Sequence, residues 1–372
     1  MFRRRRPAEL SADDVVLLYA LGLGRAPSAE EISLQLEAEQ TWEQLARLIA
    51  ASDEHRQKRS PAASPGTQAV INFHTGSTDS FEYQPGTYSP DGSSRVGSDG
   101  HVFLVAGTNS ILDQFRGDYS VPDGWEQNWR AVLEERSDQA DHIGVPVYTL
   151  TVPDKLAISP EQFPDAIAAP GPRPAERLLA LWPSMLYPVD ELRACGGDAT
   201  LRTDTHLTPH GNRALASALG DTLGVDLLGN TTLEDSPYLT SGDLGSKFNP
   251  PIVEITHSGG GFGAAELIAD SSARFFAQGL HVGVRQHLRN KNAPDQRTVL
   301  IFGDSYARAA DHYRGLAWYV AQGFANTHLV WIPFGWDANV VDQLSADLVI
   351  SQGAERFVTR VPGNTVELQP YD

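Results

Sequence analysis

Apolar and polar positions recur at helical spacing near the start of the chain. Ser11 is placed to cap a first helix, Ser28 and Glu31 form a capping box before a second, and Thr41 begins a similar box before a third. Three helices of this length bury little apolar surface by themselves. We therefore expect residues 1–58 to form a small all-α domain that docks on another surface.

The pattern changes after this segment. Residues 59–69 have the Ser, Pro and Ala content of a linker, and the remaining chain, 70–372, alternates short apolar runs with amphipathic stretches. Strands are predicted at 102–105, 145–150, 299–302 and 328–332, helices after Asp123, Pro174 and Thr208, and a surface excursion at 236–262. Alternating strands and helices predict an α/β domain with a largely parallel sheet between two helical layers.

Composition excludes several classes of protein. The chain is 41% hydrophobic and 20% charged, as expected of a globular protein with a sizeable core. With 29 basic and 47 acidic residues its formal charge is −18, which repels nucleic acid and anionic membranes. The single cysteine, Cys195, cannot form an internal disulfide, and no Cys/His spacing predicts a zinc site.

The N-terminus begins with four arginines, Arg3 to Arg6, which could start a secretory signal. The sequence that follows contains Asp13 and Asp14 before a short apolar stretch, and it has no small-residue cleavage site. Elsewhere no apolar run is long enough for a transmembrane helix. These features predict a cytoplasmic protein.

The sharpest local signal for chemistry is Gly303-Asp304-Ser305. An apolar strand leads directly into this tripeptide, and apolar residues at helical spacing follow it. A serine in this position lies at the carboxyl end of a sheet strand, where open α/β folds place ligands. We expect the Ser305 N–H to lie at a helix N-terminus and to face a developing oxyanion. The alternative is that Asp304 or Ser305 only caps the helix.

A second signal is Asp204-Thr205-His206, just before a helix with Thr208 at its N-cap and Pro209 at its first position. Side chains two residues apart on an extended segment point the same way, so the Asp204 carboxylate can reach the His206 ring. Nucleophile, base and orienting acid are the parts of a serine triad. The alternative is a solvated surface loop.

Together these motifs resemble the SGNH hydrolase superfamily. Their reversed order, with Asp-Thr-His-x-Thr-Pro-x-Gly first, resembles the alginate O-acetyltransferases of the AlgX and AlgJ type. Supporting stretches lie at 97–104, 152–155, 241–248 and 353–357, and the resemblance covers about residues 90–362. It implies an SGNH-like fold in which Ser305 takes the acyl group, His206 acts as general base and Asp204 orients it. Leu207 departs from the family's tryptophan at that position. The N-terminal segment resembles a helical domain attached to bacterial polysaccharide enzymes.

The oxyanion hole of this family adds a glycine N–H and an asparagine side chain to the serine N–H. Asn109, after the strand predicted at 102–105, is our candidate, and Gly335 is a second one. Ordinary turn chemistry explains either residue equally well. Trp318, Trp331 and Trp336 could stack on sugar rings or belong to the core.

We therefore expect an O-acetyltransferase that acts on a sugar or polysaccharide through an acyl-serine. The first alternative is a carbohydrate acetylesterase with the same triad, and the second is a non-catalytic carbohydrate-binding or assembly subunit. The expected partners are a carbohydrate acceptor and an acetyl donor, supplied by a membrane acyltransferase or glycosyltransferase partner. We expect no metal, no other cofactor and no nucleic acid. The net charge favours a neutral or weakly charged glycan.

Overall fold

A computed structural model describes residues 10–23, 27–38, 44–45, 48–49, 52, 83–107, 109–167, 172–229, 231–233, 236–249, 251–252, 254–258, 261–310 and 313–365. The linker predicted at 59–69 and the capping box predicted at Thr41 lie outside these residues.

The helices are α1 (Ala12–Leu23), α2 (Ala29–Glu37), α5 (Ile111–Arg116), α6 (Trp125–Ile143), α7 (Lys155–Ile158), α8 (Pro174–Leu181), α9 (Val189–Ala194), α10 (Pro209–Leu223), α11 (Gly242–Gly245), α12 (Ser272–Phe276), α13 (Leu316–Gly323) and α14 (Ala338–Gln343). The strands are β1 (Ser94–Val96), β2 (Val102–Leu104), β3 (Val147–Val152), β4 (Thr232–Leu233), β5 (Ser236–Thr240), β6 (Glu254–Ser258), β7 (Gly261–Phe262), β8 (Glu266–Asp270), β9 (Arg285–Arg289), β10 (Asp295–Gly303), β11 (Ala309–Ala310), β12 (Tyr313–Arg314), β13 (Phe324–Trp331) and β14 (Leu348–Ala354).

The central sheet has six strands in the order β3-β14-β10-β13-β9-β8. The first four strands are parallel, as predicted, whereas β9 and β8 run antiparallel at one edge. Residues 290–294 alone connect β9 to β10, and a parallel crossover needs a dozen residues or more. The short connection therefore forces β9 to run against its neighbours.

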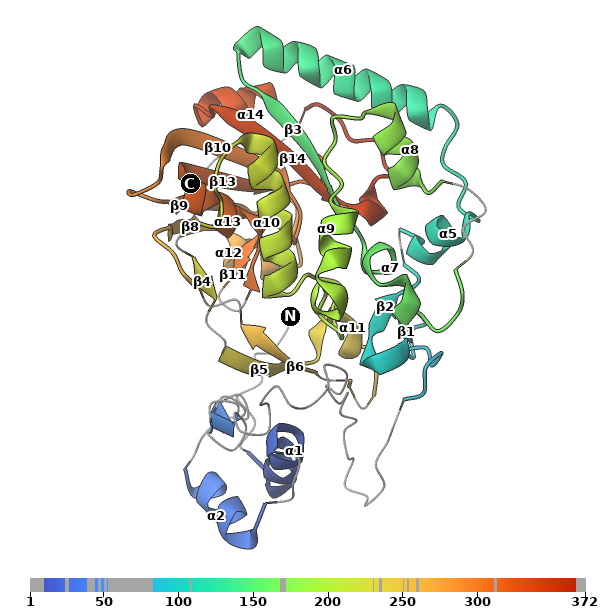
Figure 1. The fold of residues 1–372 in the computed structure, drawn as a ribbon, viewed down its shortest axis with the longest axis vertical. Coiled ribbons are helices and arrows are strands. Elements are labelled where there is room, and N and C mark those ends of the chain that lie inside the picture. Colours follow the sequence, from blue (N-terminus) through green and yellow to red (C-terminus); the bar gives the residue numbers. More distant parts are fainter. Residues whose placement is uncertain are drawn as a thin grey trace.

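Helices cover both faces of this sheet, so the predicted three-layer α/β/α architecture is confirmed (Figure 1). Along β10, Val299 and Ile301 pack with α10 and α13, while Leu300 and Phe302 pack with α14 and the end of α6. Because both faces of β10 are buried, the strand reads as one continuous apolar run in the sequence. The carboxyl end of β10 is thus held rigidly.

The N-terminal residues form a hydrophobic cluster of their own. Val15, Leu18 and Tyr19 from α1 pack with Leu45 and Ile49, with α2 beside them. The capping box predicted at the start of α2 is present. Within the described part of the chain, no helix has the length and apolarity to cross a membrane.

The strand predicted at 102–105 is present as β2, which pairs with β1 in a two-stranded sheet and not in the central sheet. The predicted start of α6 needs correction. Asp123 does not cap α6, because Gly124 takes a left-handed conformation with φ 74° just before the helix, and no side chain caps it. The excursion predicted at 236–262 contains α11 and the antiparallel pair β5 and β6.

Candidate active site

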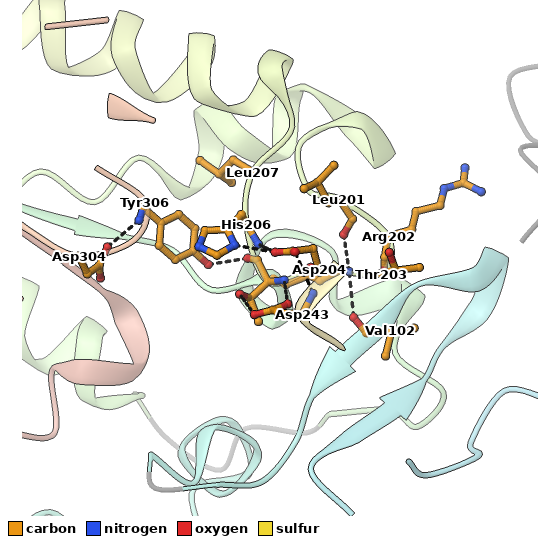
Figure 2. Close-up of polar contacts among 12 residues, drawn as sticks. Val102, Leu201, Arg202, Thr203, Asp204, His206, Leu207, Asp243, Asp304 and Tyr306 are labelled. Carbon is orange, nitrogen blue, oxygen red and sulfur yellow. Dashed lines mark hydrogen bonds and ion pairs between the residues drawn. The ribbon is translucent and has the colours of Figure 1, made fainter. Parts of the chain in front are cut away.

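The loop before α10 brings Asp204 and His206 together (Figure 2). Asp204 Oδ1 lies 2.6 Å from His206 Nδ1 and also accepts the His206 backbone N–H at 2.9 Å. The two side chains meet through a tight turn, in which the carboxylate accepts an N–H two residues later, and not along an extended segment. The helix starts as predicted: Thr208 Oγ1 accepts the Gly211 N–H, with Pro209 at the first helical position.

Lys155, at the start of α7, is buried beneath this loop. Its Nζ donates to the carbonyl oxygens of Val102, Leu201 and Arg202 at 2.9, 2.5 and 2.7 Å, and to that of Asp204 at 3.3 Å. Burial lowers the pKa of Lys155 to about 8, although nearby carboxylates favour its charged form. Because an ammonium group can only donate, this side chain fixes the path of the loop through its carbonyls.

Glu254, at the start of β6, holds the other side of the loop. Its carboxylate accepts the Arg202 N–H at 2.9 Å and both the N–H and the hydroxyl of Thr203 at 2.7 Å. Gly242 crosses the same segment with φ 54°, and a Cβ there would lie 2.3 Å from the Thr203 carbonyl oxygen. Only glycine fits this crossing, which brings the start of α11 against the loop.

Asp243, the next residue, supplies a second acid to the site. Its carboxylate accepts the N–H of Thr205 at 2.8 Å and the Thr205 hydroxyl at 2.7 Å. Its own backbone N–H donates to Asp204 Oδ2 at 2.9 Å, which satisfies the second oxygen of that carboxylate. Asp204 is therefore held by hydrogen bonds at both oxygens and can aim only one way toward His206.

The two carboxylates and the hydrogen bond between Asp204 and His206 shift the pKa values of the site residues. Burial lowers the pKa of His206, but the hydrogen bond to Asp204 and the charges of Asp204 and Asp243 outweigh it, so the net pKa is raised. Burial raises the pKa of Asp204, yet its hydrogen bonds hold it well below the usual range. Burial and the Asp204 charge raise the pKa of Asp243. An ionised Asp204 thus stabilises a protonated His206.

Asp204, His206 and Asp243 each place one donor atom within 4.8 Å of the other two. Carboxylate and imidazole donors at this spacing could surround a cation. However, Asp204 Oδ1 and His206 Nδ1 lie at 2.6 Å, the distance of a strong charge-assisted hydrogen bond. A cation would have to replace that bond, so the geometry favours an imidazole–carboxylate pair.

Ser305 lies on the turn that follows β10, and Asp304 anchors this turn. Asp304 is buried, and its carboxylate accepts the N–H of Tyr306 and the amide of Gln352, each at 3.0 Å, and the N–H of Ala354 at 2.7 Å. The last two partners belong to β14. The aspartate in Gly-Asp-Ser therefore ties the serine turn to a neighbouring strand of the sheet.

The helix predicted directly after Ser305 is absent. The Ala307 N–H donates to the Asp304 carbonyl at 3.0 Å and closes a turn, β11 and β12 follow, and α13 begins only at Leu316. The N–H and the carbonyl of Ala309 both bond to the Gln286 amide of β9, at 2.9 and 2.6 Å, so this segment makes its hydrogen bonds with β9 and not within a helix. The Ser305 N–H is therefore in a turn and not at a helix N-terminus, and it has no hydrogen-bond partner among the described residues.

Tyr306 joins the two halves of the site (Figure 2). Its hydroxyl donates to the Thr205 carbonyl at 2.5 Å, and its ring centroid lies 5.0 Å from that of His206. Ser305 is thus adjacent in the chain to a side chain that contacts the His206 ring. Within the described part of the chain, no hydrogen bond joins the Ser305 hydroxyl to His206.

The two oxyanion candidates occupy different settings. Asn109 follows β2, which lies outside the central sheet, and its Oδ1 is buried without a hydrogen-bond partner in the described residues. Gln114 links this loop to the site, since its amide donates to the carbonyls of Asn109 at 2.6 Å and Arg356 at 3.3 Å. The N–H of Gly335 donates to the Ile332 carbonyl at 3.0 Å, so it is used within its own turn.

Sequence reasoning did not assign roles to Lys155, Asp243 or Glu254. Lys155 and Asp243 occur in stretches that carry the family resemblance. The position of Lys155 shortly after an apolar strand was the signal that could have indicated a buried ammonium group. Glu254 gave no signal, because its partners, in Arg202 and Thr203, lie about fifty residues away in the sequence.

The three tryptophans near Ser305 differ in exposure. Trp318 and Trp336 are 3% and 0% exposed and belong to the two main core clusters. Trp331, the last residue of β13, is partly exposed and lies opposite Gly303 in the sheet register. Of the three, only Trp331 can meet a ligand.

No family model matches the chain, and no curated protein matches it. Among solved structures, it is similar to a DHHW family protein from Eubacterium siraeum, with TM-score 0.47 and 15% identity over 72% of this chain and 92% of that one. It is similar to Bacillus cereus PatB1 with a sulfonyl adduct, with TM-score 0.48 and 13% identity over 71% and 95%. It is also similar to the O-acetyltransferase domain of Pseudomonas putida AlgJ, with TM-score 0.43 and 14% identity over 74% and 93%.

Proposed function

We propose that the protein is a serine acyltransferase that moves an acetyl group to a hydroxyl of a sugar or polysaccharide. The observation that carries this proposal is the Asp204–His206 pair at 2.6 Å, set against Tyr306, with Ser305 as the preceding residue on the turn after β10. An acid-oriented imidazole beside a serine at the carboxyl end of a central strand is the arrangement that acyl transfer requires.

In the first step, His206 Nε2 removes the proton from the Ser305 hydroxyl, and Oγ attacks the carbonyl carbon of the acetyl donor. The oxyanion that forms is stabilised by the Ser305 N–H, with Asn109 as the candidate second donor. His206 then gives the proton to the leaving group, and the bond between donor and acyl group breaks. Asp204 keeps the imidazole in the required tautomer and stabilises its charged form.

In the second step, a sugar hydroxyl replaces the leaving group. His206 takes the hydroxyl proton, the oxygen attacks the acetyl-Ser305 carbonyl, and the proton returns to Ser305 Oγ as the enzyme is regenerated. Water in place of the sugar would make the same site an acetylesterase. The partition between the two acceptors depends on how well a sugar is held beside Ser305.

The test is acetylation of Ser305 by 4-nitrophenyl acetate, followed by intact-protein and peptide mass spectrometry. We expect one acetyl group on Ser305 in the wild-type protein and none in Ser305→Ala. The control is Ser217→Ala, an exposed serine on α10, which should acetylate as the wild type does. Wild-type turnover in Ser305→Ala would refute the proposal, and a folded protein that never acetylates would make it a non-catalytic subunit. Adding neutral oligosaccharides then separates acetylated sugar from free acetate.

A further inference from the structure

Three rings and a guanidinium group form a cluster on the side of Ser305 that faces β8 and β9. The ring centroids of Phe276 and His281 lie 6.1 and 5.4 Å from that of Trp331, and 5.2 Å from each other. The Arg308 guanidinium lies 5.0 Å above the Phe276 ring. His281 is exposed and Phe276 is 37% exposed, so solvent reaches the cluster. We call these four residues the aromatic platform.

The platform lies on the same edge and the same face of the sheet as the triad residues. Trp331 is paired with Gly303 at the ends of β13 and β10. Side chains alternate along β13, so Trp331 shares the face of Leu329, which packs in the cluster that also contains Leu207. Arg308 is three residues after Ser305, so their Cα atoms are at most ~11 Å apart.

The platform is rigidly supported. Arg308 Nε donates to the Ser272 hydroxyl at 3.0 Å, and the Gln286 amide bonds both the N–H and the carbonyl of Ala309, at 2.9 and 2.6 Å. The segment after Ser305 is thereby fixed to β9 and α12. On the other side, the Gly283 N–H donates to the Trp331 carbonyl at 3.0 Å and holds the His281 turn against β13.

We propose that the aromatic platform binds a pyranose ring of a neutral glycan acceptor and so presents a neighbouring sugar hydroxyl to Ser305. This inference rests on the proposed function. The C–H face of a pyranose is apolar and packs on an aromatic ring, while its rim of hydroxyls needs donors and acceptors nearby. The platform offers both, because the Arg308 guanidinium lies over the Phe276 ring and the Asp270 carboxylate lies 4.0 Å from that guanidinium.

An anionic membrane is the competing occupant. Leu280 and Val282, 50% and 63% exposed, lie in the same turn as His281 and could enter a bilayer surface. The formal charge of −18 opposes approach to anionic lipid, and the guanidinium and carboxylate beside the rings suit hydroxyl groups better than acyl chains. The observations therefore favour a sugar.

The experiment measures binding of cellohexaose, mannohexaose and chitohexaose to the full chain carrying Ser305→Ala, by calorimetry. We expect saturable binding of at least one of them, about tenfold weaker in Trp331→Leu and in His281→Ala, and largely retained in Trp331→Phe. Phenylalanine keeps a ring face where leucine keeps only apolar volume. His281 is exposed, so its substitution leaves the fold intact, and thermal melts verify this for all variants.

Sugar binding and acetylation of Ser305 are measured independently, so each can be lost without the other. Acetylation of Ser305 by 4-nitrophenyl acetate is therefore measured separately, with Ser217→Ala, which lies outside the platform and the triad, as the variant expected to react at the wild-type rate. Binding that depends on Trp331 without any acetylation of Ser305 would remove the proposed function and keep the sugar site. Four results would each overturn the neutral-sugar assignment. Two are that none of the three hexasaccharides binds, or that binding is unchanged in Trp331→Leu and His281→Ala. The others are that the protein prefers a hexamannuronate, or that it sediments with phosphatidylglycerol vesicles in a way that depends on Trp331.

Discussion

Replacing Asp243 with asparagine should move the pH dependence of the proposed reaction to lower pH. Among the described residues, the charges of Asp204 and Asp243 favour the protonated His206 ring, and that of Arg356 disfavours it. Asparagine removes one negative charge, while its amide oxygen can still accept the Thr205 N–H. The loop should therefore keep its shape, and the pKa of His206 should fall.

The size of the shift follows from the distance between donor atoms. At 4.8 Å, the limit for this cluster, two unit charges interact by about 0.9 kcal/mol in water and about 3.5 kcal/mol at an effective dielectric of ~20. These energies correspond to about 0.6 and about 2.5 pKa units. Asp243 keeps contact with solvent even though the groups packed around its carboxylate raise its pKa, so solvent screening places the expected shift near the lower value.

The assay is the pH profile of kcat/KM for an acetyl ester, whose acid limb reports the pKa of the base in the free enzyme. His206 must be neutral to act, so activity falls as pH decreases through its raised pKa. In Asp243→Asn the acid limb should lie about 0.6 pH units lower, with the alkaline plateau within about threefold of the wild type.

Glu266→Gln is the matched control, because Glu266 is exposed on the edge strand β8 and carries the same charge. It should leave the acid limb in place. High salt should reduce the difference between Asp243→Asn and the wild type, since exposed charges are screened. An acid limb that stays in place or moves upward in Asp243→Asn would refute the electrostatic role assigned to this carboxylate.

Two further predictions concern the scaffold of the loop. Lys155→Met should lower the free energy of unfolding by at least ~3 kcal/mol in urea denaturation, because several buried carbonyls lose their donor. A wild-type midpoint would contradict this. Gly242→Ala should cost about 2–4 kcal/mol and slow acetylation of Ser305, since its Cβ would meet the Thr203 carbonyl at 2.3 Å. Gly144→Ala, with φ 70° and nothing within 4 Å, should cost only about 1 kcal/mol and leave acetylation unchanged. Equal effects of the two glycine changes would show that steric contact at Gly242 is unimportant.

The sequence predicted the features that depend on neighbours along the chain. Thr208 and Pro209 start α10 because capping is decided within four residues. The contact between Asp204 and His206 follows from a separation of two residues, although a turn and not an extended segment produces it. The apolar run before Gly-Asp-Ser was also correctly predicted to be a strand, since β10 is buried on both faces.

Features set by distant contacts were not predictable in this way. Residues after Ser305 have helical spacing, yet Ala307 lies in a turn and α13 begins only at Leu316, because the backbone of Ala309 bonds to the Gln286 side chain of β9. Lys155 and Glu254 act on backbone groups that are far away in sequence, and no local periodicity records such partners. The antiparallel edge at β9 depends on a connection length whose meaning appears only once the strand order is known.

The two halves of the site are anchored in different parts of the fold. The Ser305 turn is tied to β14 through Asp304, whereas the loop of Asp204 and His206 is tied to Lys155 and Glu254, outside the four parallel strands. Tyr306 is the junction between them. Substitutions around the loop can therefore reposition the base while the nucleophile stays in place. Such an arrangement lets the position and the pKa of the base be tuned, in evolution or in a directed library, without moving the nucleophile.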